Sequence, residues 1–180
     1  AFVAPVGLTN LLKPCPLLIV SVPSGGSALR ALPGVTNTAL TAGWAVLAAE
    51  GPQVDPNVDS VQFGWAILSS VLEQFHRTWP PSKRWPVACA GFSGGAKRSA
   101  TTAAAMAKGG YRVVGIFMGG CNEDRVTLGV QLYQPGDRFK SVPIFLSNGA
   151  SDPIANPMHA ASVAASMRQS GFRLIRLESY

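Results

Sequence analysis

The sequence is short, apolar and weakly charged. Its 180 residues are 47% hydrophobic and only 13% charged, which excludes a disordered tail or a coiled coil and suits a sheet covered on both faces. A chain of this length can bury a substantial core, and we expect one domain over residues 1–180. The net charge is +6, but Lys and Arg are scattered without forming a stripe, so we expect no nucleic-acid partner.

Membrane, metal and cofactor functions also lack support in the sequence. No apolar stretch reaches the roughly 18 residues that a membrane-spanning helix needs. Cys15, Cys89 and Cys121 stand far apart and show no metal-ligand spacing, so we expect neither a metal nor an organic cofactor. Cys89 falls in an apolar run and is expected in the core, whereas a disulfide between Cys15 and Cys121 is left open.

The N-terminal half of the chain alternates between strand and helix patterns. The apolar run 17–22 ends in Pro23-Ser24-Gly25-Gly26 and predicts a buried strand entering a turn. A short helix at 36–44 and a strand at 45–49 follow. Residues 57–60 offer helix N-caps, and the apolar stripe behind them ends before Pro80. That stripe consists of Val61, Trp65, Leu68, Leu72 and Phe75.

The C-terminal half continues the same alternation. Its apolar runs predict strands at 87–90, 113–118, 142–146 and 172–177, and helices are predicted at 94–108 and 159–169. Buried strands joined by helices are typical of parallel pairing. The sequence therefore predicts an α/β fold, with a mostly parallel sheet and helices on both faces as in a three-layer sandwich.

A glycine-flanked serine stands between the predicted strand 87–90 and the helix that follows it. Gly91-Phe92-Ser93-Gly94-Gly95 matches G-x-S-x-G in the strand–turn–helix context of a nucleophile elbow. Small residues two before and two after the serine permit the sharp turn, and the helix N-terminus favours a developing oxyanion. A serine N-cap or a phosphate-binding turn is the competing interpretation, but neither GxxxxGK[ST] nor GxGxxG is present. We therefore predict Ser93 as a nucleophile.

A second constellation follows the predicted strand 142–146. Asn148-Gly149-Ala150-Ser151-Asp152-Pro153 places a carboxylate at the carboxyl end of a strand, after the serine in chain order. In a catalytic triad such a carboxylate orients a histidine. Asp152 is thus the predicted acid of a triad, although Asp-Pro is also ordinary turn chemistry.

Together these motifs resemble a known family. Residues 59–63, the helix after them, the elbow and the 148–153 turn are similar to secreted α/β-hydrolase esterases, over about residues 12–178. The polyhydroxybutyrate depolymerase and feruloyl esterase group, and phospholipase/carboxylesterase-like proteins, are the nearest in pattern. The resemblance implies a serine hydrolase that cleaves small-molecule or polymer-linked carboxylic esters through an acyl-enzyme on Ser93.

The sequence departs from the family pattern at the loop that completes the oxyanion hole. The family carries a His-Gly pair where this chain has Val22-Pro23-Ser24-Gly25. Pro23 has no N–H, so the resemblance implies Ser24 as one donor and Gly94 as the other.

The second departure concerns the histidine, which in this family follows the last strand. The sequence holds only His76 and His159, and it stops at Tyr180. His76 is expected to be solvated or to cap a helix, and His159 is a weaker candidate for the base. Two explanations stay open: a fragment that lacks terminal elements, or a degenerate, non-catalytic binding module. A leader removed before Ala1 gives an expectation of export to the periplasm or the medium.

Overall fold

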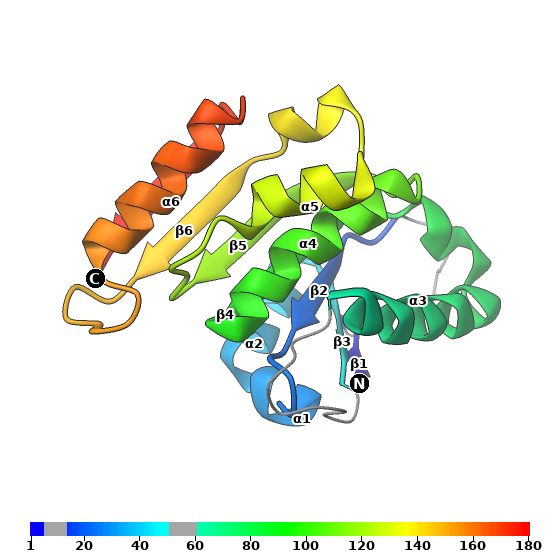
Figure 1. Ribbon diagram of the computed structural model, residues 1–180. Coiled ribbons are helices and arrows are strands. Elements are labelled where there is room, and N and C mark those ends of the chain that lie inside the picture. The colour runs from blue at the N-terminus through cyan, green and yellow to red at the C-terminus, as the bar shows by residue number, and fades with distance from the viewer. Residues whose placement is uncertain (6–13, 51–60) are drawn as a thin grey trace.

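The computed structural model describes residues 1–5, 14–50 and 61–180, and within them a seven-stranded sheet in the order β1-β3-β2-β4-β5-β6-β7 (Figure 1). All neighbouring strands pair in parallel except β1 and β3, which are antiparallel. The strand bounds are β1 Phe2–Val3, β2 Leu17–Ser21, β3 Ala45–Ala49, β4 Val87–Phe92, β5 Val113–Gly119, β6 Ile144–Asn148 and β7 Ile175–Ser179. The predicted α/β sheet is confirmed.

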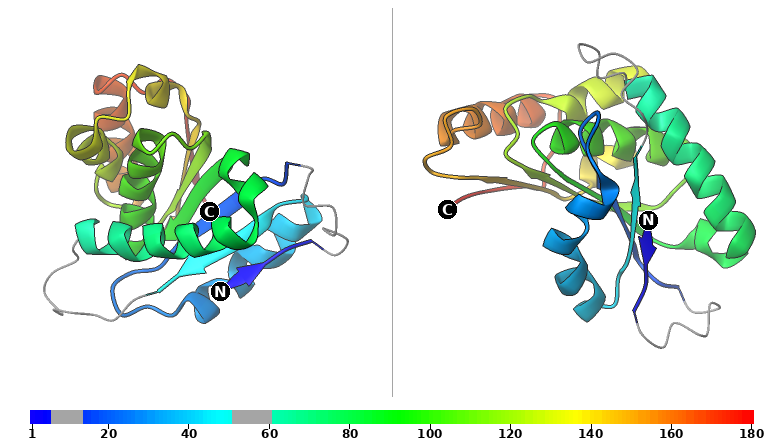
Figure 2. Two further views of the ribbon diagram at one scale, coloured as in Figure 1. Left: turned by 90° about the vertical axis from the view of Figure 1, so that its right-hand side faces the viewer. Right: turned by 90° about the horizontal axis from the view of Figure 1, so that it is seen from below.

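Helices flank both faces of this sheet (Figure 2). On one face lie α3 (Val61–Thr78), α4 (Gly94–Lys108), α5 (Arg125–Tyr133) and α6 (Pro157–Gln169). On the other face, α1 (Ala28–Ala31) and α2 (Pro33–Thr41) pack on β2 and β3. Right-handed crossovers explain why the helices are divided between the two faces. From β2 the chain first crosses to β3 on one side, and it then moves in the opposite direction across the sheet to form β4, β5, β6 and β7.

Side chains along β2 and β3 point alternately to the two faces of the sheet, so the core has two layers. Leu17 and Ile19 belong to the large cluster beneath α3–α6, whereas Val20 and Val46 pack with α1 and α2. Successive strand residues point to opposite faces, so a continuous apolar run supplies both layers. This explains why the strand patterns in the sequence are almost unbroken by polar residues.

Some predicted elements begin or end elsewhere. The strand expected at 142–146 is β6 at Ile144–Asn148, because Val142 still belongs to the end of a 3₁₀ turn at Asp137–Ser141. The strand expected at 172–177 is β7 at Ile175–Ser179, since the Phe172 N–H closes α6 by donating to the Met167 carbonyl. The expected N-caps at 57–60, and residues 59 and 60 of the family resemblance, lie outside the described residues.

Helix α5 is absent from the sequence-based prediction. Gly129 at its centre lowers helix propensity, yet a Cβ there would lie 2.9 Å from the Cβ of Ala104 in α4. The glycine therefore allows two helices to approach closely. Its N-cap is Asp124, whose carboxylate accepts from the Thr127 N–H at 2.9 Å.

The three cysteines are buried free thiols, so the disulfide left open between Cys15 and Cys121 does not form. Burial raises the pKa of the Cys89 thiol to about 12, and it also raises the pKa of Cys121. Cys89 is a core side chain, as predicted. Among the helices described here, none has the length and apolar character to cross a membrane.

His76 lies in the core, and the expectation of a solvated or capping histidine is wrong. Its side chain is buried, with Nδ1 2.6 Å from the Ser82 hydroxyl and Nε2 2.9 Å from the Tyr111 hydroxyl. Because the Ser82 Oγ–H donates to the Trp79 carbonyl, Ser82 accepts from His76 Nδ1–H, and Nε2 accepts from Tyr111. The neutral ring therefore links α3 to the start of β5.

The hydrogen bonds of neutral His76 with Ser82 and Tyr111 predict that the protein loses stability in acid. Burial, and then the nearby Lys83 ammonium, lower the pKa of His76 below its usual 6.5. The unfolded chain then binds a proton more readily, so the free energy of unfolding should fall as pH drops from about 6.5 through the lowered pKa. Urea denaturation at several pH values should show a shallower decline for His76→Gln than for the parent. Equal slopes in the two proteins would contradict the assignment.

Candidate active site

Ser93 occupies a strained turn between β4 and α4. Its φ is 54° and its ψ −121°, a left-handed conformation that residues with a side chain rarely adopt. The Ser93 N–H donates to the Gly119 carbonyl at the end of β5, at 2.8 Å, while the Ser93 carbonyl accepts from Ala96 N–H. The side chain makes no capping bond to its helix and is solvent-exposed. The structure thus presents the hydroxyl rather than using it as an N-cap.

Two glycines permit this turn. A Cβ on Gly91 would lie 2.2 Å from the Gly95 carbonyl oxygen, and a Cβ on Gly95 would lie 2.4 Å from the Ser21 carbonyl oxygen. These are contacts of backbone with backbone, which a rotamer change cannot relieve. Both flanking glycines of the predicted elbow are therefore required by sterics.

The N-terminus of α4 supplies backbone donors beside the hydroxyl. Gly94 and Gly95 are its first residues, and the N–H groups at such positions have no intrahelical partner. The helix dipole adds positive potential at the same end. The Gly94 N–H is therefore suitably located for a developing oxyanion, as the elbow motif implies.

The predicted second donor lies in a turn that packs on the elbow. The Gly26 N–H donates to the Pro23 carbonyl at 2.8 Å, and Gly25 has a φ of 70°, as the third position of a type II turn requires. A Cβ on Gly94 would lie 2.9 Å from the Cβ of Pro23. The segment that carries Ser24 therefore adjoins the elbow directly.

Arg98 connects this turn to α4, a link absent from the sequence-based prediction. Its Nη1 donates to the Val22 carbonyl and its Nη2 to the Ser24 hydroxyl, each at 2.8 Å. In the sequence Arg98 stands only as half of a basic pair with Lys97. The signal that could have revealed it is a cation close to a helix N-terminus, where the dipole disfavours positive charge.

Asp152 lies in the turn after β6 and is held ionised. Its Oδ1 accepts from the N–H groups of Ala155 and Ile154 at 2.9 and 2.8 Å. These bonds, that from Ala155 foremost, lower the pKa of the Asp152 carboxyl. The buried Asn148 side chain secures the turn by donating to the Ala155 carbonyl at 2.5 Å.

Ser93 directly follows β4, and Asp152 lies in the turn after β6. Because β4, β5 and β6 are parallel, the carboxyl ends of these strands lie on the same side of the sheet (Figure 1). The strand ends are joined edge to edge, since Ser93 N–H donates to Gly119 and Gly120 N–H donates to Ser147. Two inter-strand spacings, roughly 10 Å, separate the ends of β4 and β6.

Neither histidine is paired with these groups. His76 contacts Tyr111, next to the amino end of β5, at the sheet edge opposite to Ser93. His159 is exposed in the first turn of α6, and its Nδ1 contacts the Ile154 carbonyl at 3.0 Å. A carbonyl only accepts, so Nδ1–H is engaged there and not on the Asp152 carboxylate.

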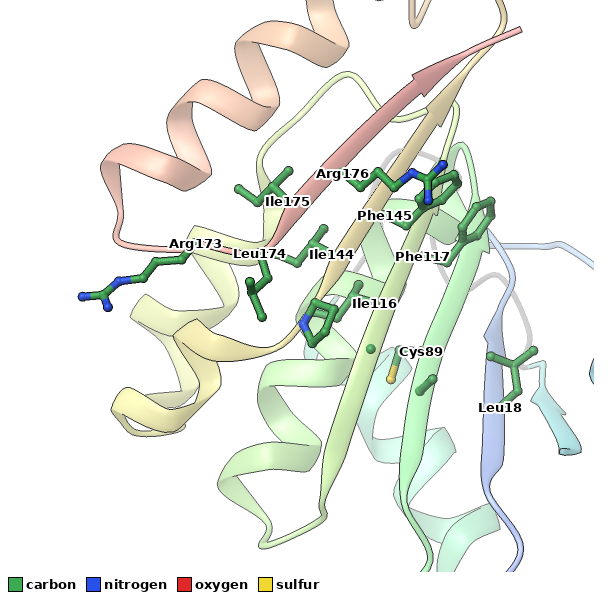
Figure 3. A pocket seen from close by; sticks show the side chains of 13 residues that line it. Leu18, Cys89, Ile116, Phe117, Ile144, Phe145, Arg173, Leu174, Ile175 and Arg176 are labelled. Atoms are coloured by element: carbon green, nitrogen blue, oxygen red, sulfur yellow. The ribbon is translucent and has the colours of Figure 1, made fainter. Parts of the chain in front are cut away.

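A groove lies on the face of the sheet opposite to α3–α6 (Figure 3), and its lining includes neither Ser93 nor Asp152. It has a volume of about 680 Å³, and apolar side chains such as Leu18, Phe117 and Phe145 line it. Phe117 and Phe145 stack at 5.4 Å, with the Arg176 guanidinium over Phe145. Within the described ranges, helices cover this face only over β2 and β3, and no cluster of His, Cys, Asp and Glu could hold a metal.

The close approach at Gly91 yields a stability prediction. Gly91→Ala should lower the free energy of unfolding by about 3 kcal/mol or more, because its methyl group would collide with the Gly95 backbone. Gly34→Ala is the control: nothing lies within 4 Å of its added Cβ, and alanine favours helix α2 by up to about 1 kcal/mol. Urea denaturation measures both. Equal stability of Gly91→Ala and the parent would contradict the packing described.

No protein-family model and no curated protein matches the sequence, but solved structures share its fold. Esterase PE8 aligns with a TM-score of 0.70 at 12% identity, covering 100% of this chain and 87% of its own. Est1E from Butyrivibrio proteoclasticus, with bound ferulic acid, gives 0.64 at 14%, covering 100% and 84%. The α/β-hydrolase enzyme MGS-M1, from a Medee basin deep-sea metagenome library, gives 0.63 at 16%, covering 99% and 72%. With its parallel sheet and flanking helices, this chain has the α/β-hydrolase fold.

Proposed function

We propose that the protein is a serine hydrolase that cleaves carboxylic esters, with Ser93 as nucleophile, Asp152 as the triad carboxylate, and the N–H groups of Gly94 and Ser24 as the oxyanion hole. The backbone conformation of Ser93 is the main observation that supports the proposal. A residue held at φ 54° by backbone contacts, with its hydroxyl exposed at a helix N-terminus, fits nucleophilic attack better than helix capping.

The chemistry follows from these positions. Ser93 Oγ attacks the ester carbonyl carbon as its proton passes to an imidazole, and the carbonyl π electrons move to the oxygen, which the two N–H groups hold. Collapse of this intermediate breaks the bond to the alcohol, which leaves with the proton from the imidazole. Water then attacks the acyl-enzyme by the same steps and releases the acid and Ser93.

The carboxylate fits its role because it stays ionised. The backbone bonds that lower the pKa of Asp152 keep its charge available to stabilise an imidazolium. They occupy Oδ1, and the second carboxylate oxygen is the one proposed to accept from the imidazole. Of the two histidines in the sequence, only His159 lies near the Asp152 turn, since it stands in the first turn of α6 and contacts the Ile154 carbonyl, and it is the candidate that experiment must test first.

Ester substrates are favoured by the open site and by the names of similar structures. Both Ser93 and its neighbour Phe92 are exposed, so a bulky or polymer-linked ester could reach the hydroxyl. Two of the similar structures are an esterase and a protein with bound ferulic acid. A non-catalytic binding module is the alternative, and the engagement of His159 with the Ile154 carbonyl is the observation that favours it.

Ester hydrolysis tests the proposal. With p-nitrophenyl acetate, Ser93→Ala should lose about 10³-fold or more in kcat/KM, and Asp152→Asn about 10²- to 10⁴-fold, since the nucleophile and the orienting charge disappear. Ser69→Ala, which alters an exposed hydroxyl of α3, is the matched control and should retain parental rates.

The assay is run on the 180-residue chain and on the natural polypeptide that contains it. Loss of turnover in His159→Gln would identify His159 as the base, whereas retained turnover would exclude it. Hydrolysis that survives Ser93→Ala would refute the proposed nucleophile. A folded natural polypeptide without turnover would favour the non-catalytic alternative.

A further inference from the structure

The Arg98 guanidinium bonds the turn Pro23-Ser24-Gly25-Gly26 to α4, the helix that follows Ser93. Arg98 stands in the second turn of α4, five residues after Ser93, and its two Nη atoms reach the Val22 carbonyl and the Ser24 hydroxyl. These acceptors lie on either side of Pro23. One planar group therefore sets the position of the turn at two points at once.

The surrounding structure accommodates this guanidinium. Gly64 lies within α3, where glycine weakens a helix. A Cβ at Gly64 would lie 3.2 Å from Arg98 Nε, closer than side chains ordinarily pack. The glycine thus provides space beside Arg98, and this contact with α3 is independent of those with the turn.

We infer that Arg98 is a positioning residue for the oxyanion hole, which holds the Ser24 N–H in register with the Gly94 N–H. The inference rests on the proposed function, because only an oxyanion gives that register a catalytic meaning. Both donors are then attached to α4: Gly94 is its first residue, and Ser24 is bonded to Arg98. Preorganised donors stabilise an oxyanion without reorganising during the reaction.

The assignment predicts a loss in kcat rather than in substrate binding. Arg98→Met should lower kcat for p-nitrophenyl acetate by about 10- to 100-fold, less than the loss of a whole donor, with KM changed by no more than about twofold. Arg98→Lys should restore little, since one ammonium cannot reproduce the planar two-point contact. Ser24→Ala, which keeps the backbone N–H but removes one acceptor, should lose less than Arg98→Met.

A thionoester analogue distinguishes positioning from general damage. Its sulfur accepts hydrogen bonds poorly, so its turnover depends less on the oxyanion hole. Arg98→Met should therefore reduce the ratio of oxoester to thionoester turnover. Arg77→Met is the control, because Arg77 is an exposed residue of α3 paired with Glu73, and it should leave rates and ratio unchanged. An unchanged oxoester kcat, or an equal loss for both esters, would overturn the inference.

A readout that does not depend on activity separates the two proposals. Hydrogen exchange of the Gly26 amide, which donates to the Pro23 carbonyl, should be faster in Arg98→Met than in the parent, while amides of α6 keep their protection. If the parent shows no esterase activity, the proposed function fails, yet the exchange still tests whether Arg98 holds the turn. Unchanged exchange would refute the anchoring itself.

Discussion

The contact of backbone with backbone at the elbow is the constraint on which the site depends. Gly91 and Gly95 bring the end of β4 against the start of α4, and Gly95 also lies against the Ser21 carbonyl of β2. No side chain intervenes, so the chain reverses direction within one residue, and Ser93 takes the positive φ. Its exposed hydroxyl and the free N–H groups of α4 are consequences of that single steric requirement.

Because of this close contact at the elbow, α4 is the helix to which most parts of the candidate site are attached. Its small residues Ala96, Ala100, Ala103 and Ala104 are fully buried, which allows the helix to lie close on β4 and β5, and Gly129 lets α5 approach it closely. Arg98 of α4 also donates hydrogen bonds to Val22 and Ser24, at the turn after β2. The proposed nucleophile Ser93 and the proposed donors Gly94 and Ser24 are therefore all attached to α4, whereas Asp152 is held independently, by the backbone of its own turn.

Local patterns in the sequence were sufficient for the elbow and for most strands, apart from the bounds of β6 and β7, because unbroken apolar runs and G-x-S-x-G act within a few residues. Local patterns were insufficient where contacts between residues far apart in the sequence determine the position or burial of a side chain. Arg98 contacts Ser24 across 74 positions, and no local pattern announces it. Likewise α5 contains a glycine that only the neighbouring Ala104 explains, and His76 is buried by Tyr111, 35 residues away. Residues 51–60 of the expected pattern lie outside the described chain.

The most direct test is to locate a covalent adduct after treatment with a fluorophosphonate, which reacts with activated serines. Peptide mapping by mass spectrometry should place one adduct on Ser93, and prior incubation with an ester substrate should slow its formation. The other exposed serines among residues 14–50 and 61–180 should stay unmodified, because none of them combines a positive φ with the N-terminus of a helix. An adduct confined to another serine, or none in the folded natural polypeptide, would contradict Ser93 as the nucleophile.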